Sequence, residues 1–230
     1  PEMSRGLGDV YKRQILEAQF TPGSGNWCTW MFGRDLVNWN NNFTWAKWVT
    51  PSRDLISAFK QEGDEVRFKE SIVYYDCNWS NYYPSDNYPF MYKCRSANSS
   101  IIKYRYADVL LLKAEALIMQ DTPDLEGAAD IIDEVRDRAK LGALPTSVRS
   151  NKNVLLNALL KERRLELAFE GQRWFDLVRL DKVEEVMNAV YSKDSGRKAQ
   201  IYTFDKNSYR LPIPQSVIDA NDKIHQNPGY

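Results

Sequence analysis

Five of the seven tryptophans in this chain fall between residues 27 and 48, in a stretch that is also rich in asparagine. An exposed indole ring can stack on the apolar face of a sugar, and a nearby amide can hydrogen-bond sugar hydroxyls. Buried aromatic side chains that hold a loop in place would give the same composition. We expect a ligand-binding site formed by Trp27, Trp30, Trp39, Asn41, Asn42, Trp45 and Trp48.

A second aromatic group lies between residues 74 and 83. Its rings could also stack on a ligand. This second candidate group consists of Tyr74, Tyr75, Trp79, Tyr82 and Tyr83.

The sequence offers little that could perform catalysis. Its single histidine, His225, lies near the C-terminus, and there is no GxSxG, HExxH or phosphate-loop motif. The 31 acidic residues supply many possible carboxylate pairs for glycoside hydrolysis. Those between residues 130 and 137 fall on the polar side of a predicted helix and should be solvated. We therefore predict a non-enzymatic protein with neither a cofactor nor a metal site.

The charge balance excludes whole classes of partner. Lysine plus arginine and aspartate plus glutamate number 31 each, so the basic surplus typical of nucleic-acid-binding proteins is missing. The longest apolar run, residues 109–112, is far shorter than the roughly 20 residues of a membrane helix. We expect no nucleic-acid partner and no membrane-spanning segment among these residues.

The three cysteines do not form a metal-binding pattern. Cys28, Cys77 and Cys94 contain no CxxC pair, and an odd number cannot pair completely within one chain. A bridge between Cys77 and Cys94 stays open as an alternative, and unpaired buried thiols are the favoured interpretation.

Residues 15–100 are expected to be rich in loops. A helix is predicted to begin near Pro51, with Thr50 as its cap, and to end at Gly63. Between residues 64 and 98 the pattern indicates loop with at most one short hairpin.

Residues 101–190 have helical periodicity. Apolar residues recur at helical spacing over 106–118 and again over 128–139, which predicts two antiparallel helices of about the 34-residue length of a tetratricopeptide repeat. A third helix is predicted over 154–180. Its many Glu and Arg residues lie beside aromatic residues, so we expect partly buried ion pairs that hold the fold together.

Residues 200–230 should form an extended tail. Prolines at 212, 214 and 228 cannot lie inside helices. The side chains expected to pin this tail to the surface are Leu211, Ile213, Val217 and Ile218.

Four segments, taken in this order, resemble the RagB/SusD family of SusD-like proteins. They are PSRDLISAF at 51–59 followed by Asp64 and Arg67, YRYADVLLLKAEA at 104–116 with VRDRA at 135–139, ERRLELAFEGQRWFDL at 162–177, and LPIP at 211–214 with QNPGY at 226–230. The resemblance covers roughly residues 45–230.

The resemblance implies a mostly α fold, a SusD-like α/α superhelix of tetratricopeptide-like helical pairs with long irregular loops and an extended C-terminal tail. Residues 15–230 would be the C-terminal part of such a domain, and residues 1–14 would be a leader outside the fold. Members of this family are about twice as long and begin with a lipid-bearing cysteine. We therefore expect a truncated chain whose helices expose apolar faces that absent helices would cover.

The function implied by the resemblance is non-catalytic binding of oligosaccharides at the surface of a Bacteroidetes-type outer membrane. The ligand would pass to a SusC-like TonB-dependent transporter, and the protein would hold the membrane only through a lipid anchor absent from this chain. Three alternatives remain: a relative that captures peptides, an intracellular tetratricopeptide-type adaptor, and a glycosidase.

Overall fold

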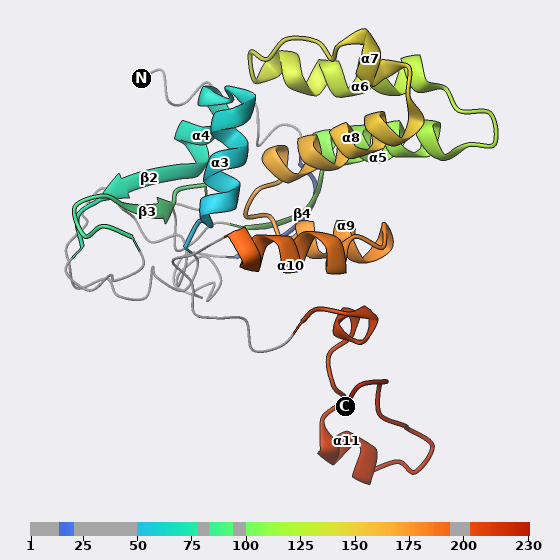
Figure 1. Ribbon diagram of the computed structural model, residues 1–230. Helices are drawn as coiled ribbons and strands as arrows, with labels where there is room; N and C mark the ends of the chain where they lie inside the picture. Colours follow the sequence, from blue (N-terminus) through green and yellow to red (C-terminus); the bar gives the residue numbers. More distant parts are fainter. Residues whose placement is uncertain (1–13, 21–49, 78–82, 94–99, 194–202) are drawn as a thin grey trace. The chain divides into compact units, whose positions relative to one another are not determined.

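The computed structural model describes residues 14–20, 50–77, 83–93, 100–193 and 203–230, and the chain forms two compact units, Pro1–Arg173 and Trp174–Tyr230 (Figure 1). Among the described helices, none combines the length and apolar character needed to cross a bilayer. The elements of the first unit are β1 (Gln14–Ala18), α3 (Arg53–Glu62), α4 (Glu65–Ser71), β2 (Ile72–Tyr75), β3 (Tyr88–Met91), β4 (Ile101–Arg105), α5 (Tyr106–Met119), α6 (Leu125–Arg138), α7 (Thr146–Arg149) and α8 (Lys152–Glu166).

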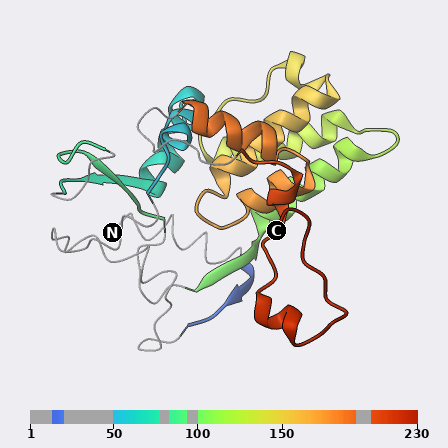
Figure 2. The same ribbon diagram turned by 60° about the horizontal axis from the view of Figure 1, so that its bottom comes forward.

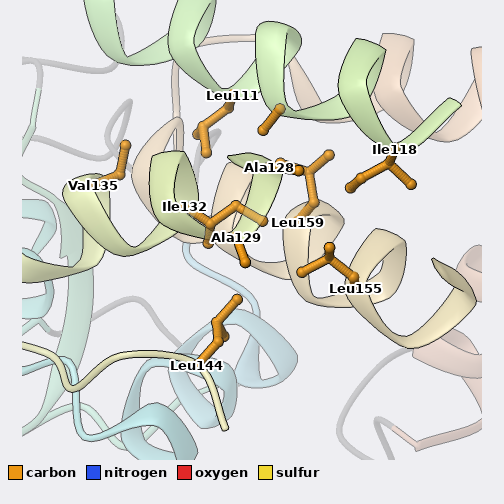
Figure 3. Close-up of a cluster of buried hydrophobic side chains, with 10 residues drawn as sticks. Leu111, Ile118, Ala128, Ala129, Ile132, Val135, Leu144, Leu155 and Leu159 are labelled. Carbon is orange, nitrogen blue, oxygen red and sulfur yellow. The ribbon is translucent and has the colours of Figure 1, made fainter. Parts of the chain in front are cut away.

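The largest core of the first unit lies where α5, α6 and α8 meet (Figure 3). Ala114 of α5 and Ala128 and Ala129 of α6 are fully buried, and their small side chains let the helices approach closely. Larger side chains such as Ile132 and Leu159 fill the space between the three helices. The predicted pair of antiparallel helices is therefore confirmed, and α8 completes its core.

Helix α3 ends at the predicted residue but has a different cap. Gly63 adopts a left-handed conformation with φ of 69°, which glycine tolerates without strain. At the other end, Ser52 Oγ accepts a hydrogen bond from the Leu55 N–H at 3.1 Å. The prediction of Thr50 as cap was wrong, because Pro51 precedes the cap and leaves Thr50 too far from the first turn.

The region after α3 is more regular than its sequence suggested. Asp64 caps α4, a helix that the sequence analysis missed, through a 3.1 Å bond from the Arg67 N–H. The predicted hairpin is present as β2 and β3, which pair antiparallel from Ile72 opposite Met91 to Tyr75 opposite Tyr88.

Strands β1 and β4 form a second antiparallel ribbon, seen side by side in Figure 2. Gln14 lies opposite Arg105 and Ala18 opposite Ile101, with irregular register between Gln14 and Glu17. Loop was expected over residues 15–100 and helix over 101–190, so neither strand was predicted. Of the expected leader, residues 1–13 lie outside the described part of the chain, whereas Gln14 is the first residue of β1.

The prediction of one continuous helix over 154–180 was wrong. Helix α8 ends at Glu166, and α9 (Arg173–Arg179) begins after a turn. Phe169 and Gly171 in that turn have φ of 66° and 79°, values that interrupt a right-handed helix.

The second unit contains most of α9, then α10 (Val183–Lys193), the 3-10 helix η3 (Lys206–Tyr209) and α11 (Gln215–Asp219). The tail is thus extended only between these short helices. Leu211 is 83% exposed and Val217 is also exposed, so the prediction that they pin the tail was wrong for these two, whereas Ile213 and Ile218 are half-buried.

Hydrogen bonds between its two motifs hold the tail instead. The Gln226 side chain accepts from the Ile213 N–H at 2.8 Å and donates to the Ile213 carbonyl at 2.9 Å. Asn227 Nδ2 donates to the Leu211 carbonyl at 2.6 Å. The LPIP and QNPGY segments therefore bind each other, and their polar groups carry the contact.

Candidate functional site

The residues predicted to bind a ligand lie outside the described part of the chain. These are Trp27, Trp30, Trp39, Asn41, Asn42, Trp45 and Trp48. The described chain resumes at Thr50, whose hydroxyl shares a hydrogen bond with the Tyr88 hydroxyl of β3.

Three tyrosines of the second aromatic group are described, and all three have structural contacts. The Tyr83 hydroxyl donates to the Pro51 carbonyl at 2.8 Å, and its ring meets the Tyr88 ring edge-on at 5.7 Å. The guanidinium of Arg53 lies 4.7 Å from the centre of the same ring. Tyr83 is therefore engaged on its ring and at its hydroxyl.

Tyr74 and Tyr75 are half-buried on the β2–β3 hairpin. Tyr74 packs at 6.4 Å from Phe68, and burial raises the pKa of its hydroxyl. Tyr75 meets Phe90 edge-on at 6.2 Å. These rings support the hairpin, whereas Trp79 and Tyr82 of the same group lie outside the described residues.

The most concentrated polar chemistry of the first unit is a charge network centred on Glu166, at the end of α8. Arg105 Nη1 donates to Glu166 Oε1 at 2.6 Å, and Arg105 Nη2 donates to the Glu166 carbonyl at 2.7 Å. Arg105 Nε reaches Glu170 at 2.7 Å, and Lys93 reaches the same carboxylate at 2.5 Å. Arg138 also pairs with Glu166.

Glu162, one turn earlier on α8, carries the network to α3, α4 and α6. Arg67 Nη1 donates to Glu162 at 2.6 Å and to Glu166 at 3.1 Å. Arg136 on α6 reaches Glu62 at 2.6 Å and Glu162 at 3.4 Å. The network thus joins five elements through side chains that are mostly buried.

The cations control the protonation of this network. Burial by itself would raise the pKa of Glu166, yet the surrounding cations outweigh burial and hold that pKa well below its ordinary value of 4.5. The pKa of Glu170 is lowered in the same way, against the effect of burial, by Lys93 and Arg105. Burial raises the pKa of Glu162, because Arg67 and Arg136 offset the desolvation only in part.

A second buried ion pair fastens α8 to α5. Arg163 Nη1 donates to Asp108 Oδ1 at 2.8 Å, and both side chains are buried. The predicted buried pairs in this region are confirmed, but their distant partners could not be named from the sequence. These partners are Arg67, Lys93, Arg105, Asp108, Arg136 and Arg138. The only sequence signal for these buried ion pairs was the high density of charged residues over 162–173, among apolar residues.

These carboxylates are committed to guanidinium and ammonium partners, which suits a structural role. In the part of the chain that the structure describes, no group of three or more His, Cys, Asp or Glu side chains is arranged to hold a metal ion. Cys77 is a free, buried thiol, as the favoured interpretation of the cysteines expected for that residue.

Comparison with known proteins finds SusD-like relatives. Two curated relatives from Formosa agariphila are the SusD-like protein P38, 43% identical over 99 residues, and the SusD-like protein P2, 36% identical over 143 residues. These matches cover 40% and 59% of this chain, and 19% and 27% of the relatives.

Two solved structures share the fold over nearly the whole chain. A SusD homologue from Bacteroides thetaiotaomicron has a TM-score of 0.70 at 20% identity, covering 95% of this chain and 52% of its own. A laminarin-binding SusD-like protein has a TM-score of 0.61 at 24% identity, covering 100% of this chain and 52% of its own. This chain therefore spans about half the length of the solved proteins.

The family model described as the SusD family matches residues 85–230, well over half of the chain. That range holds three of the four segments on which the resemblance was based. The mostly α fold of the structure agrees with that of the solved SusD-like proteins. The chain belongs to the SusD family.

Proposed function

We propose that this chain is part of a protein that binds oligosaccharides without cleaving them at the surface of a bacterial outer membrane. The observation that carries the proposal is membership of the SusD family over residues 85–230. A structural neighbour that covers the whole chain is a laminarin-binding protein, which supports a glycan as the ligand class.

The aromatic segment before α3 is the proposed place of ligand contact. Trp27, Trp30, Trp39, Trp45 and Trp48 would supply stacking surfaces, and Asn41 and Asn42 would bond sugar hydroxyls. The described tyrosines of the hairpin are packed against other side chains, which favours the tryptophan segment over them. Such sites typically bind in the mM to µM range, about 4 to 8 kcal/mol.

The bound oligosaccharide would be delivered to a SusC-like TonB-dependent transporter, with the protein held at the membrane by a lipid anchor outside these residues. Co-purification of such a transporter with the tagged protein from detergent-solubilised outer membranes tests the partner. Protease treatment of intact cells tests the location, since a surface protein is digested while a periplasmic one survives.

Affinity electrophoresis tests the ligand class. The protein expressed from its whole gene is run through gels that contain plant, host or microbial polysaccharides. Retardation by one class supports glycan capture and names the ligand. Migration unchanged in every gel would reject glycan capture and favour a peptide-binding relative.

Substitution of the tryptophans tests the site. We expect at least one Trp→Ala change among the five to weaken binding by about 1–2 kcal/mol, or roughly five- to thirtyfold, because a stacking surface is lost. Phe175→Ala is the control, because this aromatic ring is 66% exposed and lies outside the segment. Equal binding by all five variants and the control would reject the proposed site.

An assay of reducing ends tests the absence of catalysis. Incubation of the protein with the polysaccharide that retards it should release no new reducing ends. Release above the level of a heat-inactivated sample would instead assign a glycosidase activity.

A further inference from the structure

The C-terminal segment of the second unit, residues 203–230, has no hydrophobic core of its own (red in Figure 1). None of its residues is buried, and the large apolar side chains of Leu211, Val217 and Tyr230 are exposed. A segment that buries so little apolar surface must offset its loss of conformational entropy largely through polar contacts. Those contacts fall into two separate sets.

The first set closes the segment on itself. The hydrogen bonds between the LPIP and QNPGY segments belong to it, and the Tyr230 hydroxyl adds a bond to the Arg210 carbonyl at 3.1 Å. Gly229, with φ of 95°, lies so close to η3 that an added Cβ would be 2.6 Å from the Asn207 Cβ. Residues 203–230 thus form a closed loop, which we call the C-terminal loop.

The helical turn at the start of the C-terminal loop is fixed by its own residues. Asp205 Oδ1 accepts from the N–H groups of Asn207 and Ser208 at 2.8 and 3.3 Å, and Ser208 Oγ accepts from the Asp205 N–H at 3.2 Å. This reciprocal capping stabilises η3 locally. In the part of the chain that the structure describes, the hydrogen bonds of residues 210–230 all stay within the C-terminal loop.

The second set of contacts joins the C-terminal loop to α9 and α10. Asn188 on α10 accepts from the Phe204 N–H and donates to the Phe204 carbonyl, both at 2.9 Å. The Phe204 ring meets the Trp174 ring edge-on at 6.5 Å. In the turn between α9 and α10, Asp181 accepts from the Tyr209 hydroxyl at 2.7 Å. The attachment is therefore made by residues 204–209 of the loop.

The contact at Asp181 depends mainly on the tyrosine. The hydrogen bond to this carboxylate raises the pKa of the Tyr209 hydroxyl to about 12, so the hydroxyl keeps its proton at neutral pH and serves as the donor. Lys206 adds little, because it lies 3.9 Å from the same carboxylate and both side chains are exposed.

We propose that the C-terminal loop is a strap that undocks from α9 and α10 as one closed body, without unfolding. Undocking breaks the bonds of the Asn188 and Asp181 side chains, whereas opening the loop breaks a different set of bonds. Parts of a native protein that are held by separate sets of contacts can open in separate steps. Undocking removes the contact of Phe204 with the Trp174 ring while the LPIP and QNPGY segments stay bound to each other.

Amide hydrogen exchange of the full chain, followed residue by residue by NMR, distinguishes the two events. The Phe204 N–H reports docking, because Asn188 accepts its hydrogen bond, and the Ile213 N–H reports closure, because Gln226 accepts its bond. Tyr209→Phe removes a docking contact, and Asn227→Ala removes a closing contact. Neither substitution alters the hydrogen-bond acceptor of either reporter.

We expect Tyr209→Phe to speed exchange at Phe204 by about tenfold and to leave Ile213 within about twofold of the parent rate. Asn227→Ala should have the opposite effect, with faster exchange at Ile213 alone. Gln215→Ala is the control, because the amide of Gln215 bonds within α11, and it should change neither rate.

Two outcomes would overturn the proposal. Similar acceleration at both reporters in either variant would show that docking and closure are a single event. Unchanged exchange at Phe204 in Tyr209→Phe, or at Ile213 in Asn227→Ala, would show that the contact removed does not hold the loop.

Discussion

Glu166 is the side chain through which most of the charge network is connected. It faces Arg105 and Arg138 through one oxygen and Arg67 through the other. Loss of its charge would remove one buried counter-ion from three cations at once, and breaking a buried ion pair from one side costs several kcal/mol. Glu162 is also buried, but there burial raises the pKa, because Arg67 and Arg136 offset the desolvation only in part.

This difference predicts unequal effects of two isosteric substitutions. Glu166→Gln should lower the free energy of unfolding by about 3–5 kcal/mol, and Glu162→Gln by about 1–3 kcal/mol. Urea unfolding followed by circular dichroism measures both. Glu134→Gln, on the exposed side of α6, is the control and should change stability by less than about 0.5 kcal/mol. Equal losses of unfolding free energy in Glu162→Gln and Glu166→Gln would show that Glu166 contributes no more to the network than Glu162.

At the scale of elements, the break between α8 and α9 is what completes the network. A continuous helix would carry Glu170 onward along the axis of α8. The turn at Phe169 and Gly171 instead leaves Glu170 beside Arg105 and Lys93, with distances of 2.7 Å and 2.5 Å. Arg105 itself lies at the junction of β4 and α5, in extended conformation, and its side chain points inward.

The turn also predicts a specific glycine effect. Gly171→Ala should destabilise the protein by about 1 kcal/mol, because alanine is strained at a positive φ. The strain is purely conformational, since no atom lies within 4 Å of the added methyl group. Gly142→Ala is the matched control, with equal space and no positive φ, and should change the free energy of unfolding by a few tenths of a kcal/mol. A loss of stability as large in Gly142→Ala would show that the positive φ at Gly171 is not the cause.

At the scale of the whole molecule, the lowered pKa values make the first unit sensitive to acid. Glu62, Glu166 and Glu170 all have pKa values below the ordinary 4.5. A carboxyl group whose folded pKa is lowered contributes stability that is fully present above 4.5. That contribution is lost as the pH falls through the folded values.

We therefore expect the urea midpoint of the protein to be nearly constant from pH 7 to about pH 5 and to fall steeply below about pH 4. In Glu166→Gln the fall should be shallower, because one of the groups that releases a proton on folding is gone. If the urea midpoint of the variant fell with pH as steeply as that of the parent, Glu166 would not change its protonation on unfolding. Helical circular dichroism, to which α5, α6 and α8 contribute strongly, is a suitable probe.

The sequence by itself determined the helices α5 and α6, the boundaries of α3 to within two residues, and the family. These depend on local information: apolar spacing at Leu111, Ala114 and Ile118, a glycine at 63, and motif residues in order. The apolar period of a helix is set by neighbours within a turn or two, so it can be read along the chain.

Only the tertiary structure decided the rest. The β1–β4 ribbon pairs Gln14 with Arg105, and the network joins Arg67 with Glu166, residues that no local pattern connects. The end of α8 likewise depended on partners from other elements, which stabilise a turn inside the range 154–180 that the apolar spacing predicted as one helix. Pairings between distant residues follow from how the elements pack, and that packing depends on all of them together.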